Sequence, residues 1–170
     1  MPANGIGSAI STIVGQNIGA GQQERADKAY HYALRMGALF LLFFGLILSR
    51  RFISQAMVTF FSTDERVIPL ATDFLSLMAF WCWSNAFYNV TQGLFQGSGH
   101  TMITMIVDAS RIWIFRLLTL WVCANVLNMG VESVWYAVVI SNGTSAAILF
   151  ALYWTGIWKK STIKIEKTES

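Results

Sequence analysis

The sequence has 170 residues, of which 55% are hydrophobic and only 12% charged, with a net charge of +3 and a mean hydropathy of +0.51. Soluble domains average about 25% charged residues, so this chain has too little polar surface for a water-soluble globule. Its basic residues lie at the ends of apolar segments and in the tail, which excludes the dense patch of a nucleic-acid-binding surface. The composition therefore predicts a membrane protein.

The apolar segments are long enough to cross a bilayer. The stretches between Asp73 and Asp108 and between Glu132 and Lys159 contain no Asp, Glu, Lys or Arg, and a spanning helix needs roughly 20 apolar residues. Helices are expected because a segment in lipid must satisfy its own backbone hydrogen bonds. We predict an all-α membrane protein with about five transmembrane helices, at residues 5–20, 27–49, 69–96, 101–126 and 132–157.

The first two helices differ in character. The first is only moderately apolar and should stop at Gly19-Ala20-Gly21, because glycine adopts the left-handed conformation that ends helices. The second is the clearest lipid-facing span. The G-x-x-x-G pairs Gly15/Gly19 and Gly93/Gly97 predict close contacts between helices.

Residues 50–61 are too short to span and too polar at one end, so we expect them to lie at the membrane interface. Ser62 and Glu65 have the spacing of a capping box, which predicts that the third long helix starts there. The positive-inside rule places the C-terminus and its basic tail, residues 159–170, in the cytoplasm.

The third long helix carries polar residues inside an apolar segment. At about 100° per residue they cluster on one face with a tryptophan. The residues are Trp81, Asn85, Tyr88, Asn89, Gln92 and Gln96. Polar side chains in lipid are costly unless they face a wet cavity or another helix. Two interpretations stay open: a cavity for a partly apolar, hydrogen-bonding solute, or hydrogen bonds between helices without a cavity.

The fourth helix adds charge. Asp108 and Arg111 are three residues apart and can pair on one helix face, which partly offsets the cost of burying each ion. The pair is either a structural ion pair or a titratable step in ion coupling. His31 and His100 have no second ligand at metal spacing, and Cys82 and Cys123 lie in apolar runs. We therefore expect no enzyme, no metal site and no cofactor.

Five stretches resemble the multidrug and toxic compound extrusion (MATE) family of transporters. The most specific runs from Gly5 to Gly21 and contains Val-Gly-Gln-Asn-Ile-Gly-Ala-Gly. The others are residues 60–64, 92–101, 111–116 and 134–137. The resemblance implies twelve helices in two lobes around a central cavity. Residues 1–158 then correspond to helices eight to twelve, part of the C-terminal lobe, with the N-terminal lobe and helix seven missing.

The activity implied by the resemblance is export of drug-like, amphipathic and often cationic small molecules in exchange for H⁺ or Na⁺. The partners are then membrane lipid and the missing N-terminal lobe, and the location is the plasma (inner) membrane. In one branch of the family an acidic residue binds the coupling cation at the position of Asn85. An asparagine oxygen can ligate sodium but carries no titratable proton. Two alternatives stay open: a flippase or exporter of lipid-linked or polysaccharide precursors, and a transport-inactive truncated fragment.

Overall fold

The computed structural model describes residues 2–160, which form helices and no strand. The predicted all-α fold is confirmed. The elements are α1 (Pro2–Gly19), α2 (Gln23–Leu48), α3 (Arg51–Phe61), α4 (Val67–Trp81), α5 (Ser84–Gly97), α6 (Thr101–Ser110), the π-helical turn η1 (Arg111–Arg116), α7 (Leu117–Asn125), α8 (Glu132–Trp154) and the 3-10 turn η2 (Ile157–Lys159). Residues 161–170 of the predicted tail lie outside the described residues.

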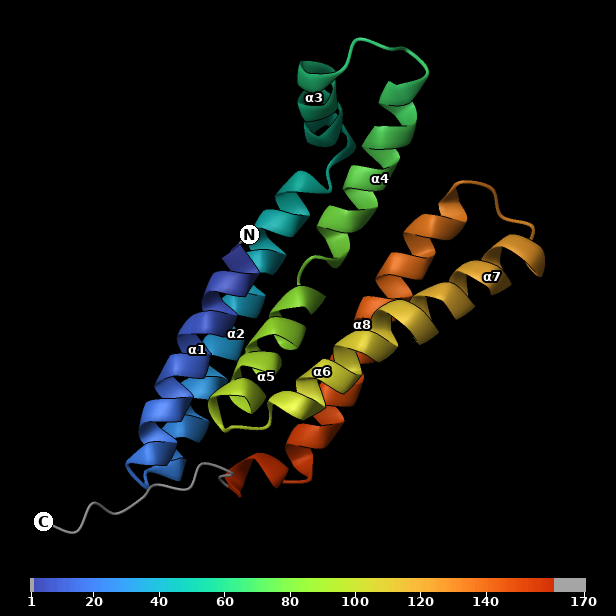
Figure 1. The fold of residues 1–170 in the computed structure, drawn as a ribbon. Helices are drawn as coiled ribbons and strands as arrows, with labels where there is room; N and C mark the ends of the chain where they lie inside the picture. Colours follow the sequence, from blue (N-terminus) through green and yellow to red (C-terminus); the bar gives the residue numbers. More distant parts are fainter. Residues whose placement is uncertain (1, 161–170) are drawn as a thin grey trace, which may run out of the picture.

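The helices pack as a bundle with α5 near its centre. Figure 1 shows α1 and α2 side by side, and α5 contacts both of them as well as α6 and α8. The continuous run of α6, η1 and α7 packs along α8. The main apolar core fills the space between α1, α2, α5 and α8, and its largest fully buried side chains are Trp158, Tyr30, Phe95, Leu94 and Leu149.

Two helices, α2 and α8, are long and apolar enough to cross a membrane individually, and α4 with α5 makes a third span if the bent pair counts as one. The outer face of α2 stays open to lipid, since Met36, Leu39 and Phe43 are each more than half exposed. The other two expected spans fall on α1 and on α6–η1–α7. That either of these two segments crosses the membrane stays a prediction.

The third predicted helix, residues 69–96, is in fact two helices bent by 50° at a break of Cys82 and Trp83. At the break the backbone hydrogen bonds join residues three apart, as in a 3-10 helix; the N–H of Asn85, for example, donates to the Cys82 carbonyl. The Cys82 thiol donates to the Leu41 carbonyl of α2 at 3.1 Å. A Cβ at Gly45 of α2 would lie 2.8 Å from the Cys82 sulfur, so the bend packs directly on α2.

Glycines bring the backbones of α1 and α5 into contact. A Cβ at Gly93 would collide with the Gly7 carbonyl, and one at Gly97 would collide with the Ser11 carbonyl. A Cβ at Gly15 would lie 3.3 Å from the Gly97 carbonyl. The predicted contact at Gly19 is wrong, because nothing lies within 4 Å of a Cβ there. The stripe of small residues on α1 is therefore Gly7, Ser11 and Gly15.

The predicted capping box is also wrong. Ser62 accepts a hydrogen bond from the N–H of Asp64, whose carboxylate accepts one from the N–H of Arg66, and α4 starts only at Val67. The polar residues thus form a turn before the helix. The expected stop after Gly19 is confirmed, with Gly21 in the left-handed conformation at φ 73°.

The segment expected at the membrane interface forms α3. Its Ser54 is buried and accepts a hydrogen bond from Ser76 of α4 at 3.0 Å. Phe52, Phe60 and Phe61 are each more than 80% exposed. An amphipathic helix with exposed aromatic rings suits the interface, and that location stays a prediction.

The glycine contact predicts a sharp difference between two conservative variants. Gly93→Ala should lower the free energy of unfolding by about 1–3 kcal/mol, because its methyl group must push apart two backbones. Gly143→Ala, within α8 and with open space at its Cβ, should be neutral or stabilising by at most about 1 kcal/mol. Unfolding in detergent, followed by circular dichroism, measures both. Equal stability of the two variants would contradict the close contact of α1 and α5.

Candidate functional site

A cavity of about 470 Å³ lies between α1, α2, α5 and the junction of α6 with η1. Its lining residues are Ala3, Asn4, Leu41, Cys82, Asn85, Tyr88, Asn89, Gln92, Asp108 and Arg111. The wall therefore combines amides, a phenol, aliphatic carbon and one pair of opposite charges. Such a mixed lining suits a ligand that is partly apolar and partly hydrogen-bonding.

The structure brings most of the sequence-predicted residues to this cavity. Four of the α5 side chains line it, and so do Asp108 and Arg111 of the fourth predicted helix. Gln96 instead lines a smaller adjoining hollow of about 210 Å³, together with Asn89 and Gln92. The role of these residues in binding a substrate stays a prediction.

Trp81 does not line the cavity, contrary to the expectation that it shares the polar face. It is the last residue of α4, before the 50° bend, and its ring stacks on Trp83 with centroids 6.2 Å apart. The helical periodicity that placed it beside Asn85 holds only along a continuous helix.

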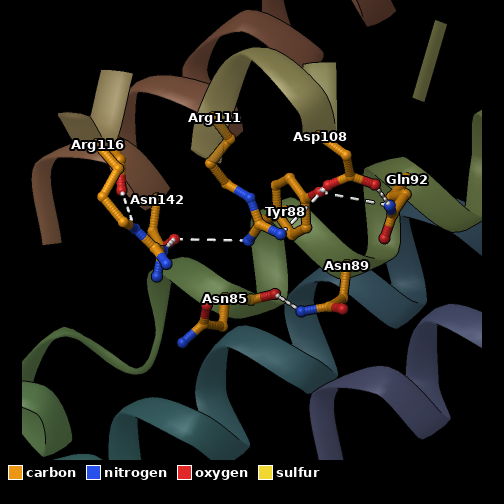
Figure 2. Close-up of polar contacts among 9 residues, drawn as sticks. Asn85, Tyr88, Asn89, Gln92, Asp108, Arg111, Arg116 and Asn142 are labelled. Carbon is orange, nitrogen blue, oxygen red and sulfur yellow. Dashed lines mark hydrogen bonds and ion pairs between the residues drawn. The ribbon is translucent and has the colours of Figure 1, made fainter. Parts of the chain in front are cut away.

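Asp108 is the centre of a polar network (Figure 2). One carboxylate oxygen accepts a hydrogen bond from the Tyr88 hydroxyl and lies 3.3 Å from an Arg111 guanidinium nitrogen. The other accepts one from the Gln92 amide at 2.6 Å. The predicted pairing of Asp108 with Arg111 is thus present. Both oxygens of the only acidic residue lining the cavity in the described part of the chain are engaged.

The Arg111 guanidinium lies over the Tyr88 ring, with its central carbon 4.5 Å from the ring centroid (Figure 2). A cation over an aromatic face is attracted by the ring's quadrupole. The same guanidinium also donates to the side-chain oxygen of Asn142 at 3.5 Å. Its Nε atom is buried and has no hydrogen-bond partner.

Asn142 and Arg116 are network members that were not among the predicted site residues. Asn142 of α8 accepts hydrogen bonds from Arg116 at 3.3 Å and from Arg111, so two guanidinium groups share one amide oxygen. Arg116 donates in addition to the Ser141 hydroxyl at 3.4 Å. An amide in the middle of an otherwise apolar span was the available signal in the sequence.

The π-helical turn η1 explains how both arginines reach one asparagine. Arg111 and Arg116 are five residues apart, which in an α-helix would point them about 140° from each other. The wider turn of a π-helix reduces this divergence, and π-helical turns are frequent at functional sites. In the described residues no group of three His, Cys, Asp or Glu side chains is placed to hold a metal ion.

Comparison with known proteins identifies the family. The MatE family matches residues 1–122. The chain belongs to the MatE family. It is 23% identical to "Probable multidrug resistance protein NorM" of Thermotoga maritima over 96% of this chain and 35% of that protein. It is 26% identical to "Protein DETOXIFICATION 9" of Arabidopsis thaliana over 95% of this chain and 33% of that protein. The chain spans about a third of the length of these curated relatives.

Together with the apolar helices, this membership makes the chain a multi-pass membrane protein and confirms the resemblance to MATE transporters. The matched region ends within α7, so the polar network lies almost entirely inside it. Only the acceptors on α8, Ser141 and Asn142, fall outside.

The shared acceptor predicts the effect of changing Asn142. Asn142→Leu should lower the free energy of unfolding by about 2 kcal/mol or more, because two guanidinium groups lose their common acceptor. Asn142→Asp should retain the stability of the wild type, since a carboxylate pairs with the same groups. Thermal unfolding in detergent compares the two, with Thr144→Val, two residues further along α8, as a control. Equal losses in the Leu and Asp variants would argue against the shared contact.

Proposed function

We propose that this chain forms the C-terminal, cavity-bearing lobe of a secondary transporter that exports amphipathic, often cationic compounds in exchange for H⁺ or Na⁺. The observation that carries the proposal is the cavity of about 470 Å³, walled by amides, a phenol and one carboxylate inside an apolar bundle. The family membership and the names of the relatives, which refer to multidrug resistance and detoxification, support it.

The proposed transporter works by alternating access. The exported compound and the coupling ion bind competing states of the cavity, and the lobes rock about it. The side-chain oxygen of Asn85 can coordinate a cation, but the amide carries no titratable proton. Among the charged groups lining the cavity, Asp108 is the one that can exchange a cation.

The proposed location is the plasma (inner) membrane, with the C-terminus in the cytoplasm. The excess of basic residues at the ends of the helices on the side of the C-terminus supports this orientation. Arg25 and Lys28 in the first turns of α2 and Lys159 of η2 contribute to this excess.

The polar face of α5 gives the test. The double variant Asn85→Leu/Gln92→Leu, expressed from the complete gene in cells lacking their own exporters, should weaken apparent affinity for ethidium about tenfold, because two hydrogen-bonding groups are lost from the cavity. The measurement is ethidium efflux at a series of ethidium concentrations. The matched control is Gln55→Leu, an exposed amide on α3 away from the cavity.

Immunoblotting of the membrane fraction separates loss of transport from loss of protein. Unchanged efflux by the double variant at equal expression would remove these two residues from the binding site. No efflux by the wild type would refute the proposed activity.

A further inference from the structure

Arg111 occupies a place in the cavity whose chemistry suits a separate organic cation. Its guanidinium lies over the face of Tyr88 and beside the carboxylate of Asp108, at 4.5 Å and 3.3 Å. An aromatic face combined with a carboxylate is the combination that attracts soft, weakly hydrated cations. Both supporting groups line the cavity and are reachable from it.

The guanidinium is poorly held in this place. Its distances to Asp108 and Asn142 are 3.3 Å and 3.5 Å, longer than the roughly 2.7–2.9 Å of strong charge-assisted hydrogen bonds. The buried Nε has no partner, which costs free energy in a water-poor site. By contrast, Gln92 donates to the same carboxylate at 2.6 Å. The carboxylate is therefore held firmly, while its cationic partner is not.

We propose that Tyr88 and Asp108 form a subsite for organic cations and that Arg111 is a tethered occupant which the arriving cation displaces. The inference rests on the proposed function and names the cation-binding groups within it. The displaced guanidinium has a destination, because Asn142 already accepts from it on the side away from Asp108 (Figure 2).

The exchange solves an electrostatic problem of a membrane cavity. An unpaired carboxylate surrounded by lipid and apolar side chains is costly. With a tethered guanidinium, Asp108 has a cationic partner both before the ligand binds and after it leaves. A neutral ligand of the same shape has no positive charge to pair with the Asp108 carboxylate, so it cannot replace Arg111 as the partner of that carboxylate.

A competitor built into the site raises the apparent dissociation constant by the inverse of the fraction of time for which it leaves the site empty. Arg111→Met removes the guanidinium but keeps an unbranched side chain of similar length. If Arg111 fills the subsite about nine-tenths of the time, this variant should bind tetraphenylphosphonium about tenfold more tightly than the wild type. Equilibrium dialysis of the purified chain in detergent measures the dissociation constants.

Three comparisons make the result specific. Arg35→Gln removes an exposed positive charge of α2 that does not line the cavity, and should leave affinity unchanged. Adding Asp108→Asn to Arg111→Met should abolish the gain, because the carboxylate is the counter-charge. Neutral triphenylphosphine oxide should gain less than twofold from Arg111→Met, because without a positive charge it is not attracted to the Asp108 carboxylate and binds elsewhere in the cavity.

Several outcomes would overturn the inference. Wild type and Arg111→Met binding tetraphenylphosphonium equally would show that Arg111 does not occupy the subsite. An equal gain for the neutral compound would show that the variant only enlarges the cavity, and an equal gain in Arg116→Gln would indicate a general charge effect. Binding by the wild type with no gain in Arg111→Met refutes the inference alone, whereas no binding by any version also counts against the proposed function.

Discussion

The backbone contact between α1 and α5 sets the orientation of everything around the cavity. Gly93 and Gly97 must face α1, since a Cβ at either position would collide with its backbone. At about 100° per residue, Gln92 then points about 100° away from Gly93. The glycines therefore do more than permit close packing. They fix the rotation of α5 about its axis, which brings Tyr88 and Gln92 to Asp108 on α6.

Charge compensation is the second constraint on this site. Two arginines and one aspartate meet between α6, η1 and α8, so the cluster carries more positive than negative charge. The surplus is held by neutral acceptors, the oxygens of Asn142 and Ser141. Of the two arginines, only Arg111 lines the cavity, and it is paired with Asp108. The cavity wall is thus close to neutral, which disfavours a flippase for lipid-linked pyrophosphates, whose ligand would need several unpaired cations there.

Prediction from the sequence succeeded where one regular helix carries the pattern. Asn85, Tyr88, Asn89 and Gln92 belong to α5 alone, so helical periodicity gave their common face correctly. Trp81 was misplaced because the break after it involves Cys82 and Trp83, neither of which is a helix-breaking residue. That bend depends on contacts with Leu41 and Gly45 of α2, which local sequence does not report.

The partners of the arginines were harder to predict for a similar reason. Asn142 is distant in sequence from η1. Its contact with Arg116 is made from a π-helical turn, and no residue type within 111–116 predicts such a turn. Periodicity at 100° per residue separates Arg111 from Arg116 and assigns them different neighbours. The spacing of Asp108 and Arg111, by contrast, is local and was predicted correctly.

The two departures from α-helical backbone, the break between α4 and α5 and the π-helical turn η1, both border the cavity. In lipid, irregular backbone is tolerated only where protein covers it or where it lines a cavity. Cys82, in the break between α4 and α5, lines the cavity, and so does Arg111, the first residue of η1. Neither feature belongs to the polar face of α5, for which the sequence left a cavity as one of two interpretations. The cavity is therefore bordered by a bend, a π-helical turn and a row of polar side chains, each of which would be costly elsewhere in the bundle.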